Sequence, residues 1–489
     1  MNRPVARYTV VIIGSGFGGQ CAALALRRIG IDDIRILERR DFMGGTWCQN
    51  TYPGAAVDVQ SPLYSIAAEP YDWSQMFAEQ DELEAYTKHV IEKHGLDAIT
   101  DLETNVERIT WDAVERRWHI ATSGAQDYRA RFVVNASGPL STPVVPPFEG
   151  RDAFEGAAFH TNDWDHDFDV RGQRVAVVGS GASAAQVIPA IVDDVAELHV
   201  FQRTPHWVIP RPDRTFTPWQ RAILRDPRAY RALRAAIYWG LETRVVGFKY
   251  SPAILELVAQ REALKHLERQ VPDADLRAKL TPDYTIGCKR IIISNTLYPA
   301  LCQPQTTLHD RTDGIERIDA TGIHTAQGTH VELDAIVWAT GYDATDGAIS
   351  YPVVGVDGER LDERWDPFPR AYLGTTVPKF PNLFIVTGPN TGIGHTSALF
   401  IIEAQMEYIT RSIRETLDRH ATSIEVREDA EDAWTTHIHS EMERTVWQTG
   451  GCTSWYQSRS GHVIAMYPGF SFMFRRFARR FRPDDHWFA

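Results

Sequence analysis

Two stretches, YTVVIIGSGFGG at Tyr8–Gly19 and RVAVVGSGASA at Arg174–Ala184, decide the fold that the sequence predicts. In each, a run rich in β-branched residues is long enough for a buried parallel strand. A glycine-rich turn follows the run, and alanine-rich sequence with helical character follows the turn. The chain is therefore predicted to contain the same strand–turn–helix unit twice, in an α/β fold.

The first turn has the spacing GxGxxG, formed by Gly14, Gly16 and Gly19, and Glu38 ends the next predicted strand, IRILE. Glycine permits a tight turn and a close approach of the backbone to a pyrophosphate, and the helix N-terminus favours negative charge. An acidic residue at the end of the second strand accepts hydrogen bonds from a ribose. An ordinary glycine-rich loop is the alternative, but the four parts in order predict a dinucleotide site.

The second turn reads GxGxxA at Gly179, Gly181 and Ala184, and the next strand ends in Gln202 and Arg203. An arginine at this place can bind a 2′-phosphate that a carboxylate would repel, so NADP is expected rather than NAD. A surface arginine at a strand end is the alternative. The sequence thus predicts two Rossmann-like dinucleotide-binding domains, with FAD in the first and NADPH in the second.

Length and composition agree with a folded chain of this kind. At about 150 residues per domain, the 489 residues leave room for roughly three domain-sized units. The hydrophobic share of 43% and the charged share of 24% are close to the globular norm. The formal net charge of -13 argues against nucleic acid as a partner, so any recognition of phosphate must be local.

The cysteines Cys21, Cys48, Cys288, Cys302 and Cys452 are too few and too scattered for a disulfide framework, and none forms a CxxC pair. A flavin disulfide reductase would need a redox cysteine pair, and the sequence predicts none, so dioxygen is the expected electron acceptor. The N-terminus lacks the pattern of a signal peptide, and no stretch of 18 apolar residues appears. We expect a cytoplasmic location, no transmembrane segment and no metal site.

A stretch rich in proline, glycine and serine at 133–150 marks a linker between the two units. A later region has apolar residues spaced as in amphipathic helices, namely Trp219, Ile223, Leu233, Ile237, Ile254 and Leu257. Strand signals return at Ala335–Ala339 and Leu383–Thr387, and a helix is expected at Ser397–Thr410. The predicted division is a first segment of the FAD-binding domain at 1–143, a first segment of the NADP-binding domain at 144–211, a helical insertion at 212–286, a second segment of the NADP-binding domain at 287–344, and a second segment of the FAD-binding domain with the C-terminal region at 345–489.

Two longer motifs are more specific than the glycine-rich turns. FEGAAFHTNDWD at Phe154–Asp165 matches the pattern FxGxxxHxxxW followed by Pro or Asp, and GGTWCQNTYPGAAVD at Gly44–Asp58 matches GGxWxxxxYPGxxxD. With both motifs in order, the chain resembles the type I Baeyer-Villiger monooxygenases, class B flavoproteins that convert ketones into esters or lactones. The resemblance extends from the first turn through GPNTGIGHTS at Gly388–Ser397, and so covers most of the chain.

The resemblance implies an NADPH- and dioxygen-dependent enzyme that acts on a ketone through a flavin 4a-peroxide, and it leaves the ketone and the oligomeric state open. GCKRI at Gly287–Ile291 is similar to the family's Lys-Arg pair. Arg290 is therefore implied beside the flavin and Lys289 at the NADP phosphate, with a solvated basic pair as the alternative. The guanidinium keeps its proton, so it can stabilise an anionic peroxide without quenching it.

Asp58 would hydrogen-bond to Arg290 and fix its orientation, although by itself such a residue could also cap a helix or lie at the surface. Arg290 and Asp58 are the expected catalytic residues. The implied FAD-binding residues are Gly14, Gly16, Phe17, Gly19, Glu38, Gly45, Thr46, Trp47, Asp58, Tyr64 and Val106. The implied NADP-binding residues are Gly179, Ser180, Gly181, Ala182, Ser183, Ala184, Arg203, Thr204, Lys289 and Arg290.

Three further segments carry expectations of their own. His160 and Trp164 lie in the first long motif and are expected to couple domain motion to the cofactor rather than to act on the substrate. Gly450–Tyr456 (GGCTSWY) is expected to line the substrate side of the flavin. Near the C-terminus, a stripe of phenylalanines flanked by arginines predicts a terminal helix that docks by its phenylalanines, with a membrane-surface helix as the alternative.

Two other functions compete with the main hypothesis. The related N- or S-oxygenating flavin monooxygenases share both nucleotide folds, but usually carry Phe or Tyr where Trp164 stands. A flavin-binding sensor or electron-transfer protein would bind both nucleotides without oxygenating anything. Fast NADPH-driven consumption of dioxygen, stimulated by a ketone, would exclude the second alternative.

Overall fold

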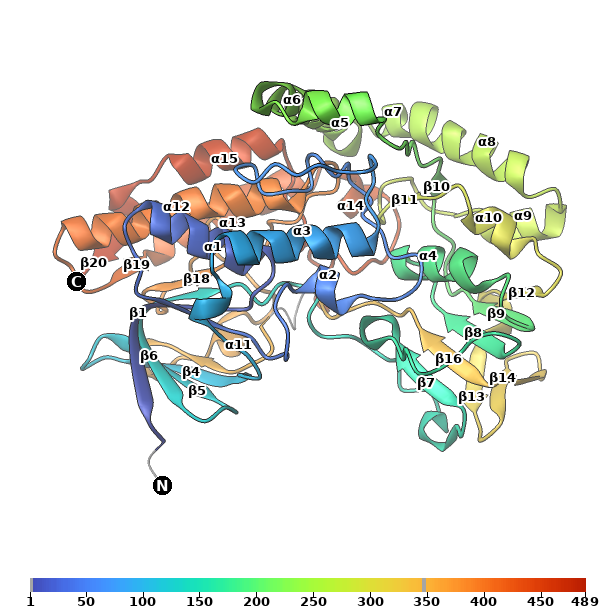
Figure 1. The fold of residues 1–489 in the computed structure, drawn as a ribbon, viewed down its shortest axis with the longest axis horizontal. Coiled ribbons are helices and arrows are strands. Elements are labelled where there is room, and N and C mark those ends of the chain that lie inside the picture. Colours follow the sequence, from blue (N-terminus) through green and yellow to red (C-terminus); the bar gives the residue numbers. More distant parts are fainter. Residues whose placement is uncertain (1–2, 345–348) are drawn as a thin grey trace.

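The computed structural model describes residues 3–344 and 349–489. Its first sheet has the strand order β17-β4-β5-β6-β1-β2-β3, with β18 paired to β6 (Figure 1). Val10–Ile13 of β1 are buried because parallel neighbours flank the strand and other layers cover both faces. The strands are β1 (Val5–Ile13), β2 (Ile34–Leu37), β3 (Thr100–Asp101), β4 (Val106–Asp112), β5 (Arg117–Thr122), β6 (Asp127–Asn135), β17 (Val353–Val354) and β18 (Leu383–Ile385).

Helices cover one face of this sheet (Figure 1). Val10 and Ile12 pack into one apolar core with α1 (Phe17–Arg28), α3 (Gln80–Lys93) and α12 (Ala398–Asp418). Val11 and Ile13 point to the other face and pack with side chains of β4 and β5 and of the region around α11 (Leu361–Arg364). The late strand β18 and helix α12 therefore complete the sheet that begins at the N-terminus.

The second sheet is wholly parallel, with the order β12-β9-β8-β16-β7. The helix α4 (Ala182–Ile191) follows β8, and α10 (Leu297–Leu301) packs against α4. An antiparallel unit is attached to this sheet. The strands are β7 (Ala157–His160), β8 (Arg174–Val178), β9 (Glu197–Phe201), β12 (Thr306–His309) and β16 (Ala335–Trp338), with β13 (Ile315–Ile318), β14 (Gly322–Thr325) and β15 (His330–Glu332) in the antiparallel unit.

The two units, one built on a mixed sheet in which β5 runs antiparallel to β4 and β6 and one on a wholly parallel sheet, confirm the predicted α/β fold class. The domain limits themselves stay a prediction, and the limit at 344/345 borders residues 345–348, which lie outside the described residues. Short 3₁₀ turns complete the described chain at Asp97–Ile99, Arg151–Ala153, Thr161–Asp163, Arg311–Asp313, Val356–Gly358 and Pro483–Asp485.

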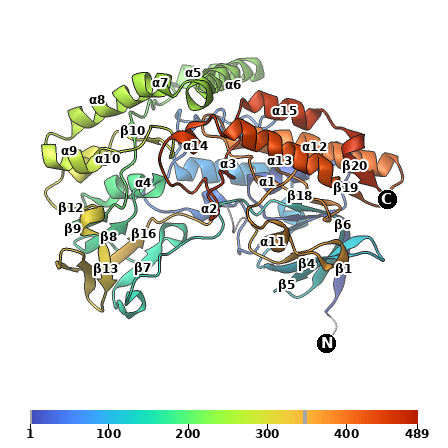
Figure 2. The same cartoon turned by 180° about the vertical axis from the view of Figure 1, so that it is seen from behind.

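The region predicted as a helical insertion lies along one rim of the molecule in both ribbon views (Figures 1 and 2). Its first two helices start at strong caps, since Thr217 forms a capping box with Gln220, and Asp226 accepts from two backbone N–H groups. The short strands β10 (Val208–Ile209) and β11 (Ile292–Ile293) pair where the chain enters and leaves this region. The helices are α5 (Pro218–Leu224), α6 (Pro227–Glu242), α7 (Pro252–Ile254), α8 (Arg261–Gln270) and α9 (Ala274–Leu280), with π-helical turns at Val246–Tyr250 and Leu255–Gln260.

The expected apolar face of this region is only partly correct. Leu233 and Ile237 pack against the main core. Trp219 and Leu257, however, are 64% and 54% exposed, and Ile223 and Ile254 are exposed too. The helices form a single layer with one side in solvent, and the π-helical turns shift the face that follows them, so a helical spacing does not decide which residues point inward.

The C-terminal segment confirms the docked-helix prediction. Phe474 of α15 (Ser471–Arg479) is fully buried, and Phe477 and Phe481 pack against the same core. Arg475 and Arg479 form ion pairs with Glu407 of α12. The other elements here are α13 (Glu428–Met442), α14 (Val446–Thr449), β19 (Ile424–Val426) and β20 (His486–Phe488).

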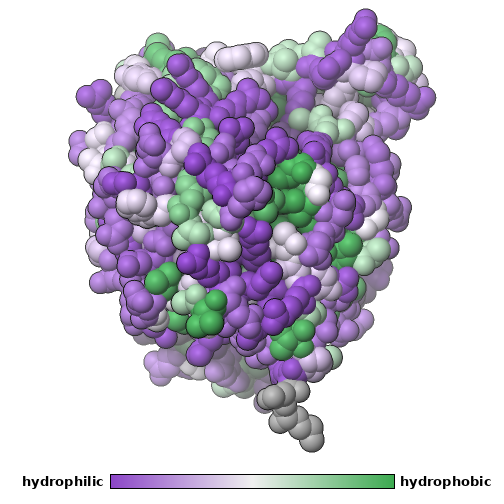
Figure 3. All heavy atoms as spheres, turned by 90° about the vertical axis from the view of Figure 1, so that its left-hand side faces the viewer, coloured by the Kyte–Doolittle hydropathy of each residue, from purple (hydrophilic) through white to green (hydrophobic). Residues whose placement is uncertain are grey.

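The face at this end of the molecule is mostly hydrophilic, with small apolar patches between hydrophilic side chains (Figure 3). Across residues 3–344 and 349–489, no helix has the length and apolar character needed to cross a membrane.

The cysteine prediction is wrong at one point. Cys288 and Cys452 form a disulfide, while Cys21, Cys48 and Cys302 are free thiols. The pair is separated by 164 residues, so no local spacing in the sequence marks it. Proximity in the fold brings the two cysteines together.

Candidate cofactor and active site

The first glycine-rich turn is shaped for a dinucleotide. Gly14 has φ +99°, and a Cβ at this residue would lie 2.6 Å from the carbonyl oxygen of Ala136. The backbone N–H and the hydroxyl of Ser15 both donate to Glu38 Oε2, at 3.0 and 2.6 Å. Only glycine fits at position 14, and α1 begins at Phe17, so the N–H groups at the start of α1 are placed for a pyrophosphate. The donor set therefore fits FAD.

Aromatic side chains stand beside this turn. Phe17 and Trp47 each contact the ring of Tyr64 edge-on, and the indole N–H of Trp47 donates to the Tyr64 hydroxyl at 3.2 Å. Gly45 has φ +66° and lies against Gly16, where a Cβ would come within 2.7 Å of the Gly16 Cα. Thr46 begins α2 (Thr46–Gln49) directly afterwards. The first glycine-rich turn and the segment that begins at Gly45, both predicted to bind FAD, therefore lie against each other.

Val106 fits its predicted role less directly. It begins β4, is 5% exposed, and its side chain packs in the core beneath the sheet. Its backbone is the part that could touch a cofactor.

The second turn is tightly packed at its first glycine and has free space at its second. Gly179 has φ +133°, and a Cβ there would lie 2.2 Å from the carbonyl oxygen of Ala339, which directly follows β16. At Gly181, by contrast, a Cβ would meet no protein atom within 4 Å. Because β9 and β16 lie on opposite sides of β8, this turn sits where an open α/β sheet usually binds its ligand.

The remaining predicted residues of this motif lie in the turn itself and at the start of the helix that follows it. Ala182, Ser183 and Ala184 form the first turn of α4, with Ala184 fully buried in the core. The Ser180 hydroxyl donates to the Thr204 carbonyl oxygen at 2.7 Å and so ties the glycine-rich turn to the end of β9.

Basic side chains from distant parts of the chain meet beside the second turn. Burial lowers the pKa of Lys289, and the nearby Arg203 lowers it further. His206 lies beside Lys289 and the second turn: its Nδ1 is 3.3 Å from the Ser180 hydroxyl, and burial together with Lys289 lowers its pKa to about 4. The structure thus places Arg203 and Lys289 near each other, and the sequence interpretation missed the neighbouring His206.

Arg290 and Asp58 form an ion pair, as the sequence interpretation expected. Their side chains are 44% and 25% exposed, so the pair is accessible from one side. Asp58 is the main reason that the pKa of Arg290 is raised, with Tyr456 and Tyr64 also contributing. Tyr456 is buried, which raises its pKa to about 12. This tyrosine belongs to the predicted substrate-side segment, but its position next to Arg290 carried no signal in the sequence.

The first long motif links the two sheets. His160 ends β7, is buried, and accepts from the Asn162 backbone N–H through Nδ1. Trp164 packs edge-on against Phe159. Gln49, which precedes the loop to Asp58, donates to the Asn162 carbonyl oxygen at 2.6 Å. This placement supports the expected coupling role.

A second contact joins the Asp58 loop to the NADP side. The Tyr52 hydroxyl donates to Gln186 Oε1 of α4, and Gln186 donates back to the Ala56 carbonyl oxygen, both at 2.8 Å. The loop that carries Asp58 is therefore held against the helix that starts at the second glycine-rich turn.

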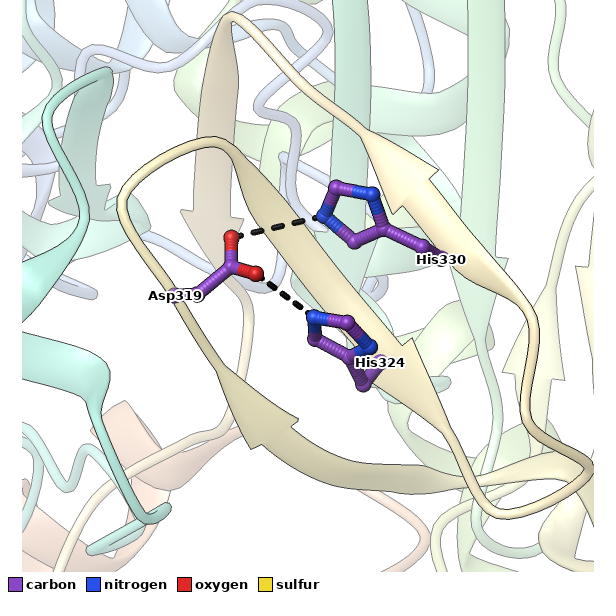
Figure 4. Close-up of side chains that lie close together, drawn as sticks. All are labelled: Asp319, His324 and His330. Atoms are coloured by element: carbon purple, nitrogen blue, oxygen red, sulfur yellow. Dashed lines mark hydrogen bonds and ion pairs between the residues drawn. The ribbon is translucent and has the colours of Figure 1, made fainter.

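Among the described residues, one group has the composition of a metal site, made of Asp319, His324 and His330 on the β13–β15 hairpins (Figure 4). Asp319 Oδ1 also accepts backbone N–H bonds from Thr321 and Gly322, and Arg317 lies 3.9 Å from Oδ2. The Asp319 carboxylate thus already has hydrogen-bond donors and a cationic neighbour. We interpret the three side chains as a hydrogen-bonded group that stabilises the hairpins.

Comparisons with known proteins decide the family. The model of the pyridine nucleotide-disulphide oxidoreductase family matches residues 11–238. A Baeyer-Villiger monooxygenase of Pseudomonas aeruginosa is 42% identical over 475 residues, covering 96% of this chain and 90% of the relative. One from Streptomyces coelicolor is 44% identical over 474 residues, covering 96% and 91%. This chain belongs to the Baeyer-Villiger monooxygenase family.

Solved structures agree with the Baeyer-Villiger assignment. Cyclohexanone monooxygenase from Rhodococcus sp. Phi1 bound to NADP+ matches with a TM-score of 0.90 and 26% identity, over 99% of both chains. An oxidised steroid monooxygenase bound to NADP matches with a TM-score of 0.87 and 28% identity, over 99% of this chain and 100% of that one. The predicted class, an FAD-containing and NADPH-dependent monooxygenase, is confirmed.

Proposed function

We propose that this Baeyer-Villiger monooxygenase inserts one atom of dioxygen next to the carbonyl of a ketone and releases an ester or lactone. The observation that carries the proposal is the Arg290–Asp58 ion pair. FAD, when bound, accepts a hydride from NADPH and activates dioxygen. The chain's own residues bind, orient and supply charge around that chemistry.

Arg290 supplies a fixed positive charge to the reacting oxygen atoms. Attack on a ketone puts negative charge on the carbonyl oxygen, and a preorganised cation stabilises that charge without reorganising. Since a guanidinium does not lose its proton in a protein, Arg290 stabilises the anion without acting as an acid. Asp58 orients the guanidinium and moderates its charge through the ion pair.

Oxygen-18 labelling tests this function. The holoenzyme is supplied with NADPH, labelled dioxygen and a panel of ketones, amines and sulfides, and products are analysed by mass spectrometry. An ester or lactone carrying one labelled atom supports the proposal. Oxidised amines or sulfides without any ester would favour an N- or S-oxygenating enzyme. A lack of NADPH-driven dioxygen consumption, with no oxygenated product, would favour a sensor or electron-transfer protein.

Arg203 and Lys289 are proposed to bind the 2′-phosphate of NADPH. Replacing Arg203 with alanine removes a charged hydrogen bond worth about 1.5–3 kcal/mol. We therefore expect kcat/KM for NADPH to fall about tenfold to a hundredfold, while kcat/KM for NADH changes little. Steady-state kinetics with both coenzymes measure the ratio.

Arg171→Ala is the matched control, because Arg171 is an exposed arginine of the same sheet unit that pairs with Asp169. The control is expected to keep the wild-type ratio. An unchanged ratio in Arg203→Ala would remove Arg203 from the phosphate site.

We propose a cytoplasmic location as well. In such a reducing compartment the Cys288–Cys452 disulfide is open to exchange with cellular thiols, and disulfides found there are usually transient, catalytic or redox-sensing.

A further inference from the structure

The disulfide lies inside the candidate active site. Cys288 is two residues before Arg290, and Cys452 is four residues before Tyr456, which adjoins Arg290. The bond therefore connects the segment that carries the predicted catalytic arginine to the segment expected to line the substrate side. Lys289, proposed to bind the NADP phosphate, lies between Cys288 and Arg290.

The two connected segments are packed closely around the bond. The Thr285 backbone N–H donates to the Gly450 carbonyl oxygen at 3.0 Å. A Cβ at Gly450 would come within 2.7 Å of the Cys288 Cβ, so the two backbones approach as closely as a glycine allows. Cys288 is fully buried in an apolar cluster that includes Phe248, Trp447 and Tyr456, with Cys452 at its edge.

Asp58 contacts the guanidinium of Arg290 and does not fix the backbone of that residue. The ion pair fixes the guanidinium, whereas the backbone from which the side chain extends is fixed by its own segment. Gly287 lies under the Phe248 ring, where a Cβ would come within 2.8 Å of the ring, and the disulfide holds the next residue. The disulfide is thus one of the contacts that hold the backbone beside Lys289 and Arg290.

We propose that the Cys288–Cys452 disulfide is a positioning element of the active site, which holds Arg290 and Lys289 in place, and that its opening by a dithiol uncouples NADPH oxidation from ester formation. This inference rests on the proposed function for its ester readout. A second readout, the affinity for NADP+, is independent of ester formation and rests on the proposed contact of Lys289 with the NADP phosphate.

The burial of the two sulfurs decides how the exchange proceeds. Cys288 is fully buried, whereas Cys452 is part-exposed and lies between the exposed residues Gly451 and Thr453. A thiolate of the dithiol attacks the Cys452 sulfur, the S–S bond breaks, and the Cys288 sulfur leaves as a thiolate that takes up a proton. The second thiol of the reagent then displaces Cys452. The protein disulfide gains two electrons and two protons, and the dithiol becomes a cyclic disulfide.

The experiment compares oxidised holoenzyme with holoenzyme treated with dithiothreitol and desalted, and alkylation followed by mass spectrometry confirms the state of both cysteines. Opening is expected to lower ester formed per NADPH consumed by about tenfold, within the ~100-fold loss that a 1 Å misplacement can cause. Hydrogen peroxide release should rise correspondingly. Titration with NADP+ is expected to show a several-fold weaker affinity, and reoxidation with a cyclic disulfide should restore both values.

Two variants complete the design. Cys452→Ser is expected to behave like the opened enzyme, and dithiothreitol should change neither its coupling nor its NADP+ affinity. Cys302→Ser removes an exposed free thiol and is expected to respond like the wild type. Full opening, confirmed by mass spectrometry, without a change in NADP+ affinity or coupling would overturn the inference.

The two proposals fail separately. An oxidised enzyme that makes no ester from any ketone contradicts the proposed function, while the change in NADP+ affinity still decides the role of the disulfide. If Cys452→Ser does not fold, the reversible dithiol treatment of the wild type supplies the same decision.

Discussion

Replacing Arg290 with alanine is expected to lower ester formation by about 100- to 1000-fold, because loss of one preorganised anion-stabilising donor costs ~2.7–4 kcal/mol. The cause is local. Arg290 is the cation paired with Asp58, and its raised pKa keeps it charged. The rate at which NADPH reduces the flavin without air should change little, since hydride transfer creates no carbonyl anion. Product assays and anaerobic stopped-flow absorbance measure the two steps separately.

Arg317→Ala is the control for this prediction. Arg317 matches Arg290 closely, with a side chain 45% exposed and an aspartate partner, but it lies on β13 in the hairpin unit. The control is expected to make ester at the wild-type rate. Wild-type ester formation by Arg290→Ala would contradict the assigned role, and equal losses in flavin reduction and ester formation would indicate a defect in cofactor binding instead.

The sequence predicted the parts of the site that depend on local spacing. Both glycine-rich turns follow a buried strand and precede a helix, so Gly14 and Gly179 could be placed from periodicity and glycine chemistry alone. The pairing of Asp58 with Arg290 came from the family resemblance, because these residues are far apart in the chain and no spacing rule connects them.

Other features depend on the tertiary fold and left no local signal. His206 lies next to Lys289, and Tyr456 lies next to Arg290. A histidine or tyrosine in a loop does not by itself indicate such a neighbour. The disulfide likewise forms across 164 residues. In the insertion, Trp219 and Leu257 have a helical spacing typical of core residues yet are exposed, because spacing describes one face of a helix and not what covers it.

Replacing Gly14 with alanine is expected to remove most of the FAD from the purified enzyme, and with it NADPH-driven oxygen consumption. Two costs add at this residue. A positive φ disfavours any residue with a Cβ by roughly 1–2 kcal/mol, and here the new Cβ would also lie 2.6 Å from the Ala136 carbonyl oxygen. The backbone of the turn must move to relieve that contact, and the N–H groups at the start of α1 move with it, away from the pyrophosphate. The ratio of flavin to protein absorbance and the thermal unfolding midpoint measure both effects.

Gly30→Ala separates the two costs. Gly30 has a similar φ of +82°, follows the same helix α1, and has no protein atom within 4 Å of a Cβ. This variant should therefore lose only the roughly 1–2 kcal/mol of the backbone term and keep its FAD. If Gly14→Ala retained full flavin content and turnover while Gly30→Ala showed the same small loss of stability, the first turn would tolerate a Cβ. The close approach of Gly14 to the Ala136 carbonyl oxygen would then not be a requirement for binding FAD.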